Sequence, residues 1–302
     1  MAHILILGGG AAGLAAALAA AQTDPTARVP GKKLLATGNG RCNLDNEGIT
    51  PESYSSADRA ALDALLRTVN AADPLGWFRA LGLYTRTDET GRVYPYSNQA
   101  ADVLALLEHH LARCSVEVRT GCTVQTLSQN RGGYVVLFSN ADGADESLRA
   151  DAVVCAMGGN AGPQFGTDGF GPRFAAQCGG ALAPLYPCLT ALQCAKPDKR
   201  LAGIRAKAHA ALYSGSTLLA DYRGEVQFTD YGLSGICIMD LTRHLTPAVK
   251  SPAVELDLFP DVAEDALSAL FAARVPLLPG DTAADFWLGL LNQKLGRTVW
   301  SA

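Results

Sequence analysis

The sequence lacks the residue spacings that mark several common classes of enzyme. Its eight cysteines are scattered, and none forms the C-x-x-C pair of a zinc site or a thioredoxin-type redox centre. There is no H-E-x-x-H motif and no recognisable Ser/His/Asp set, so a hydrolase has no support. We therefore expect no metal site, and we expect reduced cysteines, mostly in the core of a cytoplasmic protein.

Charge is also scarce. Charged residues make up 18% of the chain, the formal net charge is −4, and the isoelectric point is near 5.7. No basic segment would attract nucleic acid or an anionic membrane surface, so we expect neither as a partner. Hydrophobic residues make up 48% of the 302 residues, which suits a globular α/β protein with a large core and one or two domains.

The stretch that organises the chain is at its start. Ile4–Leu7 is a short, unbroken apolar run, as expected of a strand buried on both faces. Gly8, Gly10 and Gly13 follow at G-x-G-x-x-G spacing, and an alanine-rich run with high helix propensity continues to Ala21. We predict a strand, a glycine turn and a helix, the opening unit of a dinucleotide-binding fold.

Each glycine of this turn has its own predicted role. Gly8 permits the tight turn, Gly10 lets a pyrophosphate approach the backbone, and Gly13 lets the helix pack close to the strand. The start of the helix, at Ala11 and Ala12, would offer free N–H groups and the positive end of its dipole to the phosphates.

A signal peptide or a membrane span would also give an uncharged run such as residues 4–23. No Lys or Arg precedes this run, which argues against a signal peptide. The consecutive glycines Gly8, Gly9 and Gly10 and the lack of anchoring flanks argue against a span.

One element of the dinucleotide fold is missing from the pattern. A second strand should end in Asp or Glu about 20 residues past the glycines, where the carboxylate holds the ribose hydroxyls. Lys32 and Lys33 stand at that distance, and Asp24 comes too early. Either the second strand is absent from this chain or the ribose is held in another way.

A second loop, rich in glycine and asparagine, follows at residues 31–43. Its backbone N–H groups and Arg41 could meet a phosphate or the edge of a flavin ring. An ordinary surface turn explains the loop equally well. The candidate ligand-binding residues of this loop are Lys33, Thr37, Gly38, Asn39, Gly40, Arg41, Cys42 and Asn43.

The glycine turn and this loop together resemble the BaiN-like bacterial flavoprotein family, predicted NAD(P)/FAD-dependent oxidoreductases with a G-K-K-L-L-x-[ST]-G-x-G-R-C-N loop. The resemblance continues in order along nearly the whole chain. Further stretches that carry it are Gly91–Ser97, Ala156–Gly159, Thr167–Gly169 and Thr229–Gly235.

The resemblance implies a fold and a cofactor site. The fold is α/β, with a Rossmann-like FAD/NAD(P)-binding domain at residues 1–187, an inserted antiparallel β-barrel-like domain at 188–260 and a small helical subdomain at 261–302. The implied FAD site adds Val124, near the adenine, and Ala156, Gly158 and Gly159 at a strand end. Beside a flavin, Cys42 is better interpreted as a structural cysteine than as a redox thiol.

The resemblance also implies an activity. It suggests an FAD-dependent oxidoreductase that takes electrons from NAD(P)H and reduces an activated, enone-type C=C bond in a small molecule. An FAD-dependent amine oxidase and a flavin- or nucleotide-binding protein without turnover are the alternatives. The sequence predicts neither the catalytic residues nor the oligomeric state.

Two parts of the family pattern are absent. One is a strand between the positions of Val29 and Gly31, and the other is a G-E-x-x-D-x-x-G-x-x-G-G-Y-N segment beyond Ser301 that closes the flavin site. Our expectation is that the sequence omits residues of the intact protein, and an intact mass near 31.5 kDa would contradict it.

Periodicity predicts the remaining elements. We expect helices within residues 56–81, 98–113 and 170–178, and hairpins within 82–93 and 123–138. Residues 116–118 and 152–157 read as strands, the second of them buried and parallel. After residue 187 an antiparallel β pattern runs to 258, and a helical pattern follows from 261 to 291.

Overall fold

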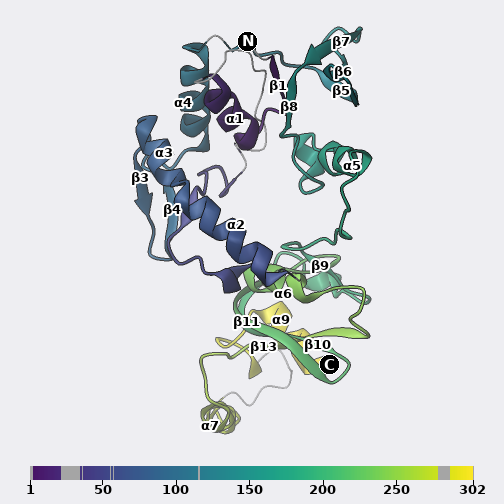
Figure 1. The fold of residues 1–302 in the computed structure, drawn as a ribbon. Coiled ribbons are helices and arrows are strands. Elements are labelled where there is room, and N and C mark those ends of the chain that lie inside the picture. Colours follow the sequence, from purple (N-terminus) through teal and green to yellow (C-terminus); the bar gives the residue numbers. More distant parts are fainter. Residues whose placement is uncertain are drawn as a thin grey trace. The chain divides into compact units, whose positions relative to one another are not determined.

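A computed structural model describes residues 3–21, 35, 37–54, 56, 58–114, 116–277 and 286–301. The chain forms two compact units, Met1–Ala183 (unit 1) and Pro184–Ala302 (unit 2). Figure 1 labels the helices and strands of both units.

Unit 1 combines helices with short sheets. Its helices are α1 (Ala11–Ala21), α2 (Arg59–Ala71), α3 (Pro74–Ala80), α4 (Ala100–Ala112) and α5 (Phe170–Gln177), with 3₁₀ turns at Pro51–Ser53 and Pro163–Phe165. Its strands are β1 (Ile4–Leu7), β2 (Asp45–Asn46), β3 (Thr85–Thr87), β4 (Arg92–Pro95), β5 (Thr123–Asn130), β6 (Gly133–Ser139), β7 (Asp145–Ala150) and β8 (Ala152–Cys155).

Strand β1 is buried on both faces, as its unbroken apolar run predicts. Ile6 packs into a cluster with Leu14 of α1 and Val103 of α4. Leu5 and Leu7, which point the other way because side chains alternate along a strand, pack into a second cluster on the β5–β6–β7 side. One four-residue strand therefore supplies side chains to both cores of unit 1.

Strand β8 pairs in parallel with β1, from Ile4 opposite Ala152 to Leu7 opposite Cys155. The two strands lie side by side next to α1 (Figure 1). The predicted direction is confirmed, but the predicted burial is wrong, because Val154 is 39% exposed. An apolar run alone does not say whether a second layer covers the outer face of its strand.

The helical predictions are confirmed where the apolar period is clear. Helix α4 buries Val103, Leu107 and Leu111 at spacings of four residues, on one face of the helix. Asp58 and Asp73 begin α2 and α3, and each carboxylate accepts from a first-turn N–H at 2.9 Å.

The remaining strands of unit 1 form two antiparallel three-stranded sheets, in the orders β2-β4-β3 and β5-β6-β7. Both predicted hairpins are present. Residues 116–118 are not a strand: they form no ladder in the described part of the chain, although Val116 packs beside the α1–α4 core. The apolar positions there serve packing rather than pairing.

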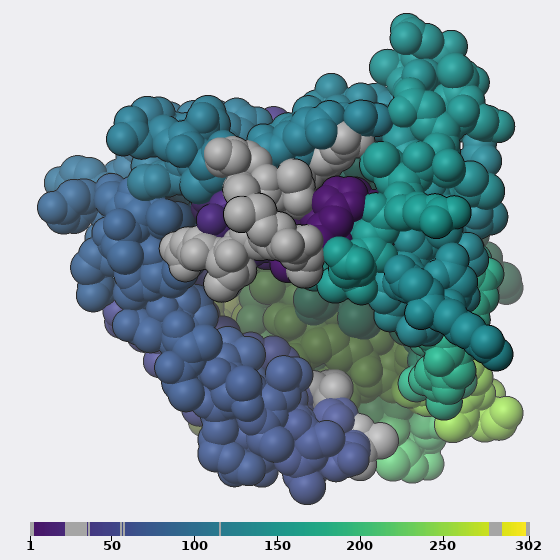
Figure 2. Space-filling view, turned by 45° about the horizontal axis from the view of Figure 1, so that its top comes forward, coloured from purple at the N-terminus to yellow at the C-terminus, as the bar shows by residue number. Residues whose placement is uncertain are grey.

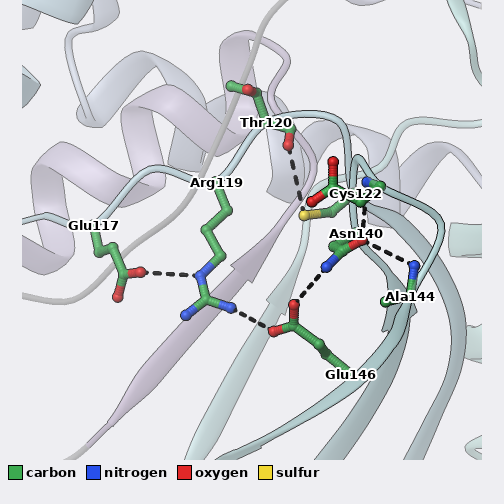
Figure 3. Close-up of polar contacts among 8 residues, drawn as sticks. Glu117, Arg119, Thr120, Cys122, Asn140, Ala144 and Glu146 are labelled. Atoms are coloured by element: carbon green, nitrogen blue, oxygen red, sulfur yellow. Dashed lines mark hydrogen bonds and ion pairs between the residues drawn. The ribbon is translucent and has the colours of Figure 1, made fainter.

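A polar network secures this segment to the β5–β6–β7 sheet (Figure 3). The Arg119 guanidinium donates to a carboxylate oxygen of Glu117 and to one of Glu146, each at 2.9 Å. Asn140 donates to the other oxygen of Glu146 at 2.8 Å. The network thus connects the residues before β5 with the β6–β7 turn and β7.

Unit 2 is built on an antiparallel sheet in the order β13-β10-β11-β12-β9. Its strands are β9 (Leu192–Gln193), β10 (Arg205–Ser214), β11 (Thr217–Phe228), β12 (Gly232–Ser234) and β13 (Pro252–Asp257). Its helices are α6 (Ile236–Leu241), α7 (Glu264–Arg274) and α9 (Gln293–Ser301), with 3₁₀ turns at Lys199–Leu201 and Thr242–His244.

The core of unit 2 lies between this sheet and α6. Ile238 and Leu241 of α6 pack against Ala208, Ala210 and Val226 of the sheet. The antiparallel β region is therefore confirmed, while its closure into a barrel and the division at residues 187 and 260 stay predictions.

Candidate nucleotide-binding site

Two glycines of the β1–α1 turn are required by contact. A Cβ on Gly8, which has a φ of +108°, would lie 2.4 Å from the carbonyl oxygen of Ala156. A Cβ on Gly13 would lie 1.9 Å from the carbonyl oxygen of Gly8. Neither position can hold a larger residue without moving backbone, so these two glycines bring β1, α1 and the end of β8 together.

Gly10 differs from its two neighbours. A Cβ there would meet no atom of the described residues within 4 Å, and its φ is not in the left-handed region. Contacts among the described residues therefore do not explain a glycine at this position. The predicted role of Gly10, the close approach of a pyrophosphate, stays a prediction.

The start of α1 presents backbone donors beside Gly10. Leu14 N–H makes the first intrahelical bond, to the Gly10 carbonyl at 3.0 Å, so the preceding N–H groups have no acceptor within the helix. Ala11 and Ala12 are exposed, and the first turn carries no acidic side chain. These donors and the dipole of an eleven-residue helix suit an anion.

The end of β8 lies against this turn. Ala156 N–H donates to the Leu7 carbonyl at 2.7 Å. Beyond it, Gly158 has a φ of +74°, and a Cβ on Gly159 would meet no atom within 4 Å. The Thr167 hydroxyl donates to the Gly159 carbonyl. The predicted glycine pair is thus at the carboxyl edge of the parallel strands, where α/β sheets bind ligands.

The described part of the second loop, residues 37–43, is a tight structure with an unusual backbone. Gly38, Asn39, Gly40 and Cys42 all have positive φ, between +57° and +83°. Cys42 N–H donates to the Thr37 carbonyl at 2.9 Å and closes the loop. Positive φ is common for Asn but costs energy at Cys42, and the ligand-binding role of this loop stays a prediction.

Arg41 is held in place by Tyr94 of β4. The guanidinium carbon lies 4.3 Å from the centre of the Tyr94 ring, and Nη2 donates to the phenol oxygen at 3.1 Å. Arg41 Nε also donates to the Gly38 carbonyl at 3.2 Å. Stacking and directed hydrogen bonds together fix the planar cation on the loop.

Cys42 lies beneath this loop and is 2% exposed. Its side chain packs in the α1–α4 core with Ile6 and Leu14. Burial raises the pKa of the Cys42 thiol, and a hydrogen bond with the Thr37 side chain opposes the rise. A buried, protonated thiol suits the structural interpretation and not a redox role.

The candidate residues thus gather around β1 in two groups. Gly8, Gly10, Ala11, Ala12, Gly13, Ala156, Gly158 and Gly159 form one continuous edge, and residues 37–43 join the same core through Cys42. Val124 is half-buried on β5, on the other side of β1 and in the second core. Asn43 is exposed. Lys32 and Lys33 lie outside the described residues. The stretch in which the expected acidic strand is missing also lies outside them.

Tyr94 is not among the cofactor-binding residues predicted from the sequence. It is 3% exposed and is the partner of Arg41. The two residues lie 53 positions apart, so spacing could not connect them. No group of three or more His, Cys, Asp or Glu side chains suited to a metal lies in the described ranges.

In the space-filling view, part of the purple N-terminal segment is visible beside teal residues of the later half of unit 1 (Figure 2). A strand–glycine turn–helix unit whose first-turn amides have no acceptor within the helix, with a glycine pair after the adjoining parallel strand, is the arrangement of a Rossmann-type nucleotide-binding fold.

The chain belongs to the family described as HI0933-like protein Rossmann domain, whose model matches residues 2–274. It is 37% identical over 307 residues to the 3-dehydro-bile acid delta(4,6)-reductase of Clostridium scindens, covering 98% of this chain and 74% of that protein. It is 24% identical over 268 residues to the ribosomal RNA dihydrouridine synthase of Escherichia coli, covering 85% of this chain and 64% of that protein.

Among solved structures, p-nitrophenol 4-monooxygenase from Pseudomonas putida aligns with 91% of this chain and 62% of its own, at 14% identity and a TM-score of 0.34. The Thermovibrio ammonificans THI4 structure aligns with 53% of this chain and 58% of its own, at 17% identity and a TM-score of 0.34.

Proposed function

We propose that this protein is an FAD-dependent oxidoreductase in which NAD(P)H supplies the electrons and an activated, enone-type C=C bond of a small molecule accepts them. The observation that carries the proposal is the contrast within the β1–α1 turn. Gly8 and Gly13 are glycine because the fold leaves no room, whereas a Cβ on Gly10 would meet no atom of the described residues within 4 Å, beside first-turn amides that have no acceptor within α1. A diphosphate fits that position.

The residues present fit the cofactor. The first-turn amides of α1, at Ala11 and Ala12, and the open backbone at Gly10 would hold the diphosphate. Arg41, fixed by Tyr94, would supply positive charge from the second loop, and the open Gly159 would let the ligand approach the end of β8. When bound, the flavin supplies hydride transfer; the protein supplies binding, orientation and local charge.

The choice of substrate class rests on the relative with the higher identity. That protein is a reductase of a 3-dehydro-bile acid, a compound with a carbonyl group on its ring system. A carbonyl conjugated to the C=C bond is what makes the bond a hydride acceptor. An amine oxidase and a protein that binds flavin without turnover remain the alternatives.

The more distant relatives act on ribosomal RNA. The formal net charge of −4 argues against RNA as the substrate of this chain, because proteins bind nucleic acid through positively charged surfaces. We therefore keep a small molecule in the proposal.

We also propose a cytoplasmic location, a β-barrel-like insertion at 188–260 and a helical subdomain at 261–302. Within the described residues, no helix is both long enough and apolar enough to cross a membrane.

The test is the absorbance spectrum of the purified protein with FAD, recorded anaerobically before and after NADH or NADPH is added. The proposal expects a bound flavin whose visible band bleaches with one of the two reductants and returns when a steroid enone is added. A sample that binds no FAD removes the proposal. Binding without bleaching supports the protein without turnover, and bleaching reversed by an RNA fragment but by no enone supports the RNA alternative.

A further inference from the structure

Unit 1 contains a pocket that the cofactor site does not use. It has a volume of about 410 Å³ and is lined by Leu83, Tyr84, Pro95, Tyr96, Ser97 and Asp102. Cavities of this size accept small organic ligands. The lining is almost wholly apolar, with Ser97 and the Asp102 carboxylate as its polar side chains beside the tyrosine hydroxyls.

Two exposed tyrosine rings line this pocket. Tyr84 is 79% exposed and Tyr96 is 71% exposed, although each has a large aromatic ring. Thr85 pairs with Pro95 at the end of the β3–β4 ladder, and Tyr96 N–H donates to the Tyr84 carbonyl at 2.8 Å. The two tyrosines are therefore cross-strand neighbours on one face of the hairpin.

The backbone on both sides of the tyrosines is fixed. Asn98, with a φ of +59°, donates its N–H to the Pro95 carbonyl at 2.8 Å and closes a turn after Tyr96. On the other strand, Leu83 N–H donates to the Phe78 carbonyl at 3.0 Å. These hydrogen bonds fix the backbone that carries the two rings and so keep the rings next to each other.

The pocket is built on the elements that hold the Arg41 loop. Tyr94, the stacking partner of Arg41, directly precedes Pro95 in β4. Ala100 N–H, at the start of the helix that carries Asp102, donates to the Gly40 carbonyl at 2.8 Å. The pocket and the candidate flavin-binding loop are thus joined by direct contacts within unit 1.

We infer that this pocket binds the ring system of the substrate, and that it selects rings whose nearby substituent is neutral or a hydrogen-bond donor over rings with an anionic substituent. The inference rests on the proposed function for calling the ligand a substrate. Tyr84 and Tyr96 offer aromatic surface to the rings, whereas Asp102 accepts hydrogen bonds and repels anions.

The experiment measures binding of two steroid probes by isothermal titration to the full chain with FAD. One probe is neutral androst-4-ene-3,17-dione and the other is anionic 3-oxochol-4-en-24-oate. We expect Tyr84→Ala and Tyr96→Ala each to weaken the neutral probe about tenfold. Tyr54→Ala is the matched control, because Tyr54 is also exposed, at 41%, and does not line the pocket; it should leave binding unchanged.

Asp102→Asn tests the selectivity. It should strengthen binding of the anionic probe several-fold and leave the neutral probe unchanged, because only the charge is removed. Wild-type affinity for the neutral probe in both tyrosine variants would overturn the inference, as would an unchanged ratio between the probes in Asp102→Asn. If wild-type protein binds no FAD, the proposed function fails, and the same titrations without FAD still decide whether the pocket binds these rings.

Discussion

The guanidinium of Arg41 stacks on the ring of Tyr94, with the guanidinium carbon 4.3 Å from the ring centre, and donates to its phenol oxygen at 3.1 Å. This contact joins the glycine-rich loop to β4. It gives the cation one orientation before any ligand binds, and so reduces the cost of ordering a long side chain at the moment of binding.

Replacing Tyr94 by Phe should therefore weaken FAD binding without loss of fold. The ring and its packing remain, whereas Arg41 loses a hydrogen bond worth about 1 kcal/mol, so the dissociation constant should rise by about fivefold at most. Arg41→Lys should have the larger effect, because an ammonium group neither stacks nor donates in the same plane. Flavin fluorescence titration measures both.

Tyr134→Phe, in the β5–β6 hairpin, is a suitable control for the loss of a hydroxyl group. Tyr94→Phe could keep the same FAD affinity as this control while Arg41→Lys weakens FAD binding. In that case the hydrogen bond from Arg41 to the Tyr94 hydroxyl does not contribute to binding. If neither variant weakens it, the loop at residues 37–43 does not contact the cofactor.

Substitutions at Gly10 and Gly13 in the β1–α1 turn should have different effects, one on FAD binding and the other on stability. Gly10→Val should fold, because a Cβ there meets no atom within 4 Å, but should bind FAD at least about tenfold more weakly. Gly13→Ala should destabilise the protein by about 3 kcal/mol or more, because its Cβ would overlap the Gly8 carbonyl. Urea unfolding and FAD titration distinguish the two.

Gly132→Ala is the matched control, since that exposed turn glycine has only one side-chain oxygen, of Asn130, near a Cβ, at 3.6 Å. It should change neither stability nor FAD binding appreciably. Normal FAD affinity in Gly10→Val would show that the cofactor does not approach this turn.

Cys42 should make the protein less stable at alkaline pH. Its ordinary pKa is 9.0 and burial raises the pKa in the folded state, so the unfolded state loses the proton first. The contribution to stability is complete below the pKa of the unfolded thiol and is lost as the pH rises through the higher pKa of the folded thiol.

We expect the free energy of unfolding of Cys42→Ala to fall less steeply above pH 9 than that of wild-type protein, although its absolute value is lower because of the cavity. Urea denaturation at a series of pH values measures this slope. Cys188→Ala, at an exposed position, is the control for loss of a thiol outside the core; a slope in Cys42→Ala identical to that of wild-type protein would refute the assignment.

The Arg119 network should contribute little to stability and should be sensitive to salt. Arg119, Glu117 and Glu146 are each more than a third exposed, and exposed ion pairs of this kind contribute little to stability. Arg119→Met should therefore leave the urea midpoint of unfolding close to that of the wild-type protein, and the small difference should shrink further in about 0.5 M NaCl, where screening is strong. A large fall in the midpoint would mean that the network fixes the segment before β5.

Short-range patterns predicted the local elements well. The glycine spacing located the β1–α1 turn because Gly8 and Gly13 are required by contacts with the adjoining strand end and within the turn itself. The four-residue period of Val103, Leu107 and Leu111 located α4 for the same reason.

Properties that depend on distant segments were not predictable in this way. The sequence around Val154 does not reveal that one face of β8 is exposed, and residues 116–118 alternate like a strand without a partner to pair with. The contact of Arg41 with Tyr94 depends on how β2 and β4 pair, which no local pattern encodes.

Strand β1 packs into two cores and leads directly into the turn of the candidate nucleotide site, so the same strand serves folding and binding. Leu5 and Leu7 belong to one core and Ile6 to the other, and the turn that would receive the diphosphate begins at the next residue. Any change that shifts this strand by one position would exchange the side chains offered to the two cores. On the proposed function, substitutions at the hairpin could therefore change substrate preference more freely than substitutions in β1 could move the nucleotide.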